Sequence, residues 1–387
     1  MSFSGATYVN VSGATTAIPG QIIQSAVWNN IHNDIGTALT MLMSQLISTP
    51  TNRNIVWMNG GFEVWQRGAG ASASIAVTAG TTVYTADRWY LIAGANQASV
   101  VSAQAGLTDR SQIAARVRRN AAETGVTAMT FGYPLDTDEI VRMRGKLLTL
   151  SFSVRAGANW SPASGTLNII LAVGTGAVAK RGGGFSSETV LISTSTNLTA
   201  GGAITAVAAS SSVVVPLTAT QAELQFTWTP VGTAGVADDF TLDDIQLDVQ
   251  YSASTWTPTL YDRLPFPEML AGCKRHYQKT FDYSVAPAQG ASSQNALTFA
   301  GASAGLLANI WWQFPVECRA TAGVTSYNPQ GASANWQDIT VAASVNASVE
   351  TALISGSKGV SIFGATVTAT STITHFVIIQ AAASASI

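Results

Sequence analysis

Four aromatic residues in the last quarter of the chain have the chemistry to bind a sugar ring: Trp311, Trp312, Tyr327 and Trp336. The faces of tryptophan and tyrosine rings are apolar and rigid, which suits the C–H face of a sugar. Trp311 and Trp312 are adjacent, so in a strand they point to opposite sides, and at most one belongs to the core of a one-sided sheet. Packing in a core or between subunits is the alternative for each ring. Because residues 283–387 hold only five charged side chains, a neutral partner is favoured over an anionic one.

Arg116 and Arg118 form a basic ridge if residues 112–118 are a strand, because they then lie on the face opposite Ala115 and Val117. Guanidinium groups bind carboxylates and phosphates through paired hydrogen bonds. The ridge could therefore hold acidic sugars or a lipopolysaccharide phosphate. The alternative is local pairing with acidic residues nearby in the sequence: Asp109, Glu123, Asp136, Asp138 and Glu139.

The sequence offers little for catalysis, and we expect neither an enzyme nor an organic cofactor. Glycoside hydrolysis needs two carboxylates that face one another, and residues 283–387 contain only Glu317, Asp338 and Glu350. The three histidines lie in unrelated segments, without a nucleophile motif or metal-ligand spacing around them. Cys273 and Cys318 are too few for a disulfide framework, so two free thiols are expected, with a single bridge as the alternative.

Low charge is the main compositional feature, since only 10% of the 387 residues are charged, against about 25% in an average protein. A net charge of −2 argues against nucleic acid as a partner. No apolar run approaches the roughly 20 residues that span a bilayer, and no basic-then-apolar segment marks a secretory signal. We therefore expect synthesis in a reducing cytoplasm, no membrane insertion, and an oligomer that buries uncharged surface against partner chains.

Residues 1–52 predict a loop and then a helix that begins near Ala26 and ends near Ile47. Six apolar residues of this helix are spaced 3, 4, 4, 3 and 4, which places them on one face: Trp28, Ile31, Ile35, Leu39, Leu42 and Leu46. The segment has too few other hydrophobic residues to form a core by itself. We predict an oligomerisation helix in a short bundle of identical helices, with packing on its own domain as the alternative.

Residues 53–257 predict a mainly β domain, a jelly-roll β-sandwich, because many short strands follow one another without helical patterns between them. Apolar and polar residues alternate most clearly over 148–154. The expected strands are 55–58, 74–78, 98–103, 112–118, 126–131, 146–155, 167–173, 189–193, 212–217, 223–229 and 240–249.

Residues 258–281 predict a proline-rich connector with a short helix at 267–278. Residues 282–387 predict a second β-sandwich, the tip. Its strands are expected at 296–299, 306–314, 338–343, 349–354, 359–369 and 372–380. The last of these is apolar on both faces, which suits a strand in a core or at a subunit interface.

Four stretches occur in a familiar order: NGGFEVWQRG at 59–68, ADRWY at 86–90, FTLDDIQL at 240–247 and PEMLAGCKRHYQK at 267–279. Together they resemble tailed-bacteriophage fibre and virion structural proteins, whose jelly-roll domains are related to carbohydrate-binding modules. The resemblance covers residues 1–281 in pieces and leaves the tip unmatched. It implies a homotrimer, attached to other virion proteins through residues 1–52 and displaying the tip outward.

The resemblance also implies a structural calcium ion. In the related carbohydrate-binding modules, a glutamate after Gly-Phe and aspartates of the last strand often hold this metal, and Glu63, Asp243 and Asp244 occupy those places. Calcium takes about six to eight oxygen ligands, and carboxylates from the first and last strands could supply several. The alternative is that Glu63 pairs with an arginine while the two aspartates face solvent.

These features and the resemblance together favour a non-enzymatic virion protein of a tailed bacteriophage, a tail fibre or receptor-binding protein. It would attach the particle to the host surface, through glycan bound by many weak contacts that avidity strengthens. A purely structural head fibre, collar or baseplate protein without a host ligand is the first alternative. A polysaccharide depolymerase is the second.

Overall fold

The computed structural model describes residues 2–4, 7–9, 33–39, 59–250, 258–301, 307–329, 335–338, 345–349, 352–366 and 375–387. The chain divides into two compact units, Met1–Arg53 and Asn54–Ile387. In the first unit, β1 (Ser2–Ser4) pairs antiparallel with β2 (Thr7–Val9), and residues 33–39 are helical. Within that helix Ile35 and Leu39 are 49% and 54% exposed. The remaining residues of the predicted stripe lie outside the described residues: Trp28, Ile31, Leu42 and Leu46.

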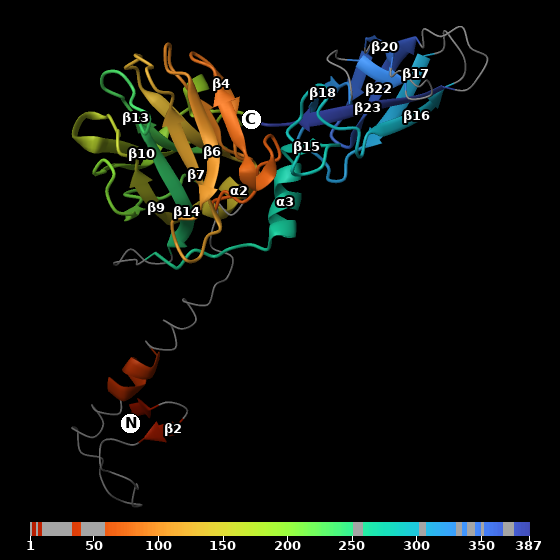
Figure 1. Ribbon diagram of the computed structural model, residues 1–387. Helices are drawn as coiled ribbons and strands as arrows, with labels where there is room; N and C mark the ends of the chain where they lie inside the picture. The colour runs from red at the N-terminus through yellow and green to blue at the C-terminus, as the bar shows by residue number, and fades with distance from the viewer. Residues whose placement is uncertain are drawn as a thin grey trace, which may run out of the picture. The chain divides into compact units, whose positions relative to one another are not determined.

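Two six-stranded antiparallel sheets form a β-sandwich in the second unit, which confirms the predicted mainly β fold (Figure 1). One sheet has the order β11 (Thr189–Asn197), β10 (Thr166–Gly174), β13 (Gln221–Trp228), β8 (Met129–Leu135), β5 (Tyr90–Ile92) and β4 (Thr82–Tyr84). The other has the order β12 (Thr205–Ser210), β9 (Leu147–Ala156), β14 (Asp239–Gln250), β7 (Ile113–Arg119), β6 (Ser99–Ala105) and β3 (Ser74–Val77). Successive strands often change sheets, as β8, β9 and β10 do.

The core of this sandwich lies between the two sheets and is rich in large aromatic residues. As the alternation predicts, Leu148, Leu150 and Phe152 of β9 face inward and are buried. The rings of Trp89 and Phe131 stack with centroids 5.0 Å apart. Burial of so much apolar area is the main source of stability for such a domain.

Several parts of the sandwich differ from the prediction. Strands β4, β5 and β12 were not predicted, and the expected strand 55–58 lies outside the described residues. Residues 212–217 form no strand; instead Ser211 N donates to Leu148 O in one sheet and Ser212 N to Leu191 O in the other. The segment bridges the sheets and so cannot join the ladder of either. The structure also contains an unpredicted helix, α2 (Thr137–Met143), which starts with a capping box between Asp136 and Glu139. Three single-turn 3-10 helices complete the sandwich: Gly70–Ser72, Ala163–Gly165 and Arg181–Gly183.

The connector leads into α3 (Phe266–Lys274), with Pro267 in its first turn as predicted. The helix ends earlier than expected, because β15 (Tyr277–Lys279) begins three residues later. Cys273 of α3 is buried, and both Cys273 and Cys318 are free thiols, as predicted. None of the helices in the described ranges is long and apolar enough to span a membrane.

The tip is a second, smaller sandwich (Figure 1). In one sheet the long β23 (His375–Ser384) is flanked by β15, β16 (Leu297–Gly301), β18 (Gly323–Tyr327) and β19 (Asn335–Asp338), and β19 pairs with β20 (Val345–Val349). The other sheet has the order β17 (Leu307–Gln313), β22 (Gly359–Thr366) and β21 (Ala352–Ser355). Trp312, Val360 and Ile362 of this sheet share a core with Ile379 and Ala381 of β23.

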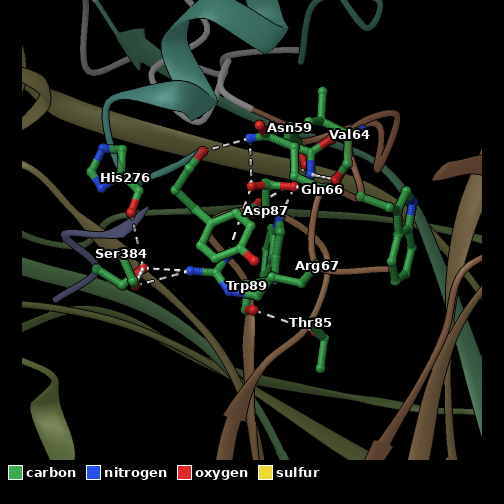
Figure 2. A network of polar contacts seen from close by, with 12 residues as sticks. Asn59, Val64, Gln66, Arg67, Thr85, Asp87, Trp89, His276 and Ser384 are labelled. Atoms are coloured by element: carbon green, nitrogen blue, oxygen red, sulfur yellow. Dashed lines mark hydrogen bonds and ion pairs between the residues drawn. The ribbon is translucent and has the colours of Figure 1, made fainter. Parts of the chain in front are cut away.

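A buried polar network joins the first sandwich to the tip (Figure 2). Gln66 Nε2 donates to Asp87 Oδ1 at 3.0 Å and to the carbonyl of Tyr277 at 2.8 Å. The Arg67 guanidinium lies 4.0 Å from the centroid of the Tyr277 ring and donates to Ser386. Burial raises the pKa of Asp87 to about 6, although Arg67 opposes the shift. The stretches 59–68 and 86–90, which carry the resemblance, therefore build this joint.

Candidate functional site

The outward face of the sheet β17-β22-β21 presents one large ring to solvent. Asn309, Trp311 and Gln313 alternate with core residues along β17, and all three are exposed, Trp311 to 55%. Its neighbour Trp312 is only 6% exposed and packs edge-on against Phe314, with ring centroids 5.0 Å apart. The two adjacent tryptophans thus point to opposite sides, as predicted, and only Trp311 is available to a ligand.

A glycine makes room for the Trp311 ring. A Cβ atom added to Gly359 of β22 would lie 2.5 Å from Cζ2 and 2.9 Å from Cη2 of Trp311. Real Cβ atoms do not approach other atoms so closely, and the same Cβ would lie 2.6 Å from the backbone oxygen of Trp312, so both the ring and the adjacent backbone need a residue without a side chain here. The indole is therefore backed by protein on one side and open on the other.

The neighbours of Trp311 on this face are neutral. Trp311 and Ile354 both pair with Ser361 of β22, so the three residues form one row across the sheet. Ile354 is 64% exposed. We call Asn309, Trp311, Gln313, Ile354 and Ser361 the Trp311 face. Its three strands contain no ionisable residue, so the face offers an apolar ring beside amide and hydroxyl groups, a combination suited to a polyhydroxylated neutral ligand.

The other predicted sugar-stacking residues do not join this face. Tyr327 belongs to β18 in the other sheet and is half-buried, and its ring meets Phe281 at an interplanar angle of 78°. Burial raises the pKa of its hydroxyl. Trp336 lies in β19, where its backbone pairs with Ser348, and its side chain lies outside the described part of the structure.

The predicted basic ridge lies on the first sandwich. Arg116 and Arg118 point outward from β7 and are partly exposed, and no ion pair to either is found among the described residues. Arg116 helps to line a hollow of about 300 Å³ together with Arg155 and Asp239. The carboxylate near Arg116 is thus Asp239 of β14, and not one of the acidic residues close to Arg116 in the sequence.

The charges in this hollow, which we call the Arg116 hollow, are only partly satisfied. Burial raises the pKa of Asp239, and Arg116 and Arg118 oppose the shift. The Nε atom of Arg116 is buried without a hydrogen-bond partner among the described residues. Such a hollow could accept a carboxylate or a hydroxyl group that bridges a guanidinium and a carboxylate.

The three predicted calcium ligands come from neighbouring segments but have protein partners. Asp243 is buried and accepts hydrogen bonds from Leu107 N at 2.7 Å, from Asp244 N at 2.8 Å and from the Ser111 hydroxyl. Burial raises its pKa to about 6. Asp244 accepts from the Thr108 hydroxyl at 2.6 Å, so neither aspartate merely faces solvent.

Glu63 is buried and forms an ion pair with Arg263 of the connector. This is the arginine pairing that the sequence left as the alternative to calcium. Within the described ranges, no group of three or more His, Cys, Asp or Glu side chains is arranged to hold a metal ion.

Arg119 is a structural residue that the sequence did not reveal. It follows the ridge on β7 but is 1% exposed, and its Nε donates to Asp238 Oδ2 at 2.9 Å. It also donates to the carbonyls of Gly125 and Gly232. The two partners of the ion pair are 119 positions apart, a separation at which a single sequence carries no pairing signal.

Comparison with known proteins gives no family assignment. No family model matches the sequence, and no curated protein is significantly similar to it. The tailspike protein 4 enzymatically active domain of bacteriophage CBA120 aligns over 51% of this chain and 21% of its own length, with 11% identity and a TM-score of 0.29. A xylan-binding domain of CBM 22 aligns over 44% of this chain and 90% of its own, with 16% identity and a TM-score of 0.28.

A putative sugar binding protein from Bacteroides thetaiotaomicron aligns over 51% of this chain and all of its own length, with 13% identity and a TM-score of 0.32. This chain therefore spans about a fifth of the tailspike domain, 90% of the xylan-binding domain and the whole of the putative sugar binding protein. At these identities and scores none of the alignments transfers a function, so a functional argument has to come from the surfaces described above.

Proposed function

We propose that this chain is a non-enzymatic virion protein of a tailed bacteriophage that attaches the particle to host-surface glycan through the tip. The observation that carries the proposal is the Trp311 face, where an exposed indole rests over Gly359 among neutral polar neighbours. Sugar rings stack on such surfaces, and amide and hydroxyl groups fix their orientation. The phage assignment is supported by the order of the sequence stretches that resemble fibre proteins.

Binding to an array of bacterial surface polysaccharides tests the proposal. We expect the full-length chain to bind neutral glycans, and Trp311→Ala to lose at least about tenfold in affinity, which corresponds to about 1.4 kcal/mol. The matched control is Val236→Ala, which trims a 75% exposed apolar residue of the first sandwich, away from the Trp311 face.

The other outcomes distinguish the alternatives. Absence of binding to the array and to intact bacterial cells would contradict the proposal and favour a purely structural role. Time-dependent release of oligosaccharides from a bound polysaccharide would contradict the non-enzymatic assignment and favour a depolymerase.

The Arg116 hollow supports a second, acidic class of glycan ligand. Its guanidinium groups and the unpaired Nε of Arg116 would suit a uronate or a phosphate group. If it acts in this way, Arg116→Ala/Arg155→Ala, which removes both guanidinium groups that line the hollow, removes binding to acidic polysaccharides and leaves neutral ones bound. Retention of acidic binding by this variant would exclude the hollow.

Self-association through the N-terminal helix is part of the proposal, because weak glycan contacts need several copies to hold a particle. The exposed Ile35 and Leu39 support it. We expect the full chain to be a trimer by light scattering, and Ile35→Asp/Leu39→Asp to give monomers. A monomeric wild type, or a trimeric double variant, would contradict this part.

A further inference from the structure

The ion pair between Glu63 and Arg263 lies where the resemblance to carbohydrate-binding modules places a calcium ion. The inference drawn from it does not depend on glycan binding. Glu63 is 4% exposed, and its Oε1 contacts Nε of Arg263, whose own side chain is 36% exposed. A carboxylate this deeply buried needs a positive partner. Arg263 reaches it from the connector that follows β14.

The carboxylates around this pair are poorly arranged for a metal. The Asp243 carboxylate is already engaged by three protein donors, and one oxygen of Asp244 is taken by Thr108. Three carboxylate oxygens are buried here without a hydrogen-bond partner among the described residues, Glu63 Oε1, Glu63 Oε2 and Asp244 Oδ1, and Oε1 is the one in the ion pair with Arg263. Calcium prefers about six to eight oxygen ligands, so these side chains offer too few.

The connector is held in place beside Glu63 by further contacts to β14. Thr259 N donates to Asp248 Oδ2 at 3.2 Å, and Asp262 N donates to Gln246 Oε1 at 2.8 Å. Tyr261 packs against Gly61, where an added Cβ would lie 2.7 Å from the tyrosine hydroxyl. These contacts fix the backbone on both sides of Tyr261 and so position Arg263 over Glu63.

We propose that the Arg263 guanidinium takes the place of a calcium ion in this jelly roll, so that the sandwich closes onto its connector without bound metal. An arginine at this position has two effects that a bound ion would not combine. It neutralises the buried Glu63, and it fastens the segment that leads through α3 to the tip. Loss of Arg263 therefore loosens the connector as well as the sandwich.

Thermal unfolding of the full chain tests this inference independently of any glycan. Wild-type protein is freed of metal with EDTA and then melted with EDTA, with calcium chloride, or with magnesium chloride at equal ionic strength. We expect the same Tm in all three. Arg263→Gln is expected to melt about 3–6 °C lower in EDTA, since a buried carboxylate loses a partly exposed partner.

Two further variants control the comparison. Arg110→Gln removes an exposed arginine that also acts on Asp244 by its charge but has no ion pair to Glu63, and its Tm should match the wild type. Arg263→Lys keeps the charge and loses the planar fork, so its Tm should fall between those of wild type and Arg263→Gln. If Arg263→Gln does not fold, Arg263→Lys and the wild-type metal series still decide.

A wild-type Tm that rises with calcium and falls with EDTA would overturn the inference, because a metal would then be holding the carboxylates. A Tm of Arg263→Gln equal to that of the wild type would overturn it as well.

Discussion

The first sandwich and the tip use charge in opposite ways. The first sandwich buries several of its charges in pairs, as in Arg119–Asp238 at 2.8 Å and Arg88–Glu139 at 2.9 Å. The tip has few charges, and Glu317 is exposed and bonded only to the Ser357 hydroxyl among the contacts described. Large aromatic residues fill the first core, whereas alanines make up much of the second.

This difference suggests that the two regions suit different roles: buried ion pairs stabilise the first sandwich, and an uncharged surface of the tip suits a neutral ligand. Buried ion pairs specify how loops and sheets meet, but each needs its partner, since an unpaired buried charge is costly. A surface without charge, such as the Trp311 face, is free to meet a neutral ligand. The predictions below break one region while leaving the other intact.

The largest effect is expected from the buried arginine. Arg119→Ala leaves the Asp238 carboxylate buried without its charge partner and removes bonds to two carbonyls. We expect a loss of about 3–5 kcal/mol in the free energy of unfolding, measured with urea. In the tip, Glu317→Gln should change it by less than about 0.5 kcal/mol. Equal effects of the two substitutions would remove the contrast between the regions.

The joint between the regions should respond to pH. The imidazole Nε2 of His276 lies 2.9 Å from Asp136 Oδ2, and Arg319 Nε lies 3.0 Å from Asp136 Oδ1. Burial, followed by the charge of Arg88, lowers the pKa of His276 to about 3. The histidine pKa in the unfolded chain is near 6.5. Between about pH 6.5 and pH 3, this histidine is therefore protonated in the unfolded chain and neutral in the folded chain.

This depressed pKa contributes stability that is complete above about pH 6.5 and is lost as the pH falls toward 3. Between pH 7 and pH 5 the wild type should lose up to about 2 kcal/mol more than His276→Gln in urea unfolding. Asp87, whose raised pKa acts in the opposite direction, is present in both proteins and so cancels. Parallel pH profiles would show that His276 titrates as it does in water.

Much of the fold could be predicted because it depends on local patterns. The alternation at 148–154 gave the inward face of β9, and Pro267 gave the start of α3. Helix α2 also has a local signal in the sequence, the capping box of Asp136 and Glu139. The prediction of a strand at 212–217 was wrong. Its three valines are typical of a strand, but the hydrogen bonds at this segment go to two different sheets.

The candidate site could be predicted less completely. Adjacent tryptophans in a strand had to point in opposite directions, but which one faced solvent depended on the second sheet. The role of Gly359 beneath Trp311 depends on how β17 and β22 pair, and the pairing of Glu63 with Arg263 spans 200 residues. Such contacts come from tertiary structure and leave no trace in sequence spacing.

A smaller effect should follow from filling the space beneath Trp311. Gly359→Ala places a Cβ 2.5–2.9 Å from ring atoms of Trp311 and 2.6 Å from the backbone oxygen of Trp312, so both the indole and the local pairing of β17 with β22 must shift while all atoms of the ring remain. We expect a several-fold loss of glycan affinity, below about 1.4 kcal/mol, with an unchanged Tm for the first sandwich. Gly323→Ala, in β18 of the other sheet, where an added Cβ meets no atom closer than 3.7 Å, serves as the matched control. Unchanged affinity in Gly359→Ala would show that the position of the ring does not matter.

The most direct test of the account is a glycan titration followed through the tryptophan indole N–H resonances of ¹⁵N-labelled protein. The Trp311 and Trp312 signals are assigned by their loss in Trp311→Phe and Trp312→Phe. A neutral glycan should shift the Trp311 signal in a saturable way and leave Trp312 in place. Saturable binding that leaves the Trp311 signal unmoved would contradict the claim that this exposed ring is the contact with the host surface.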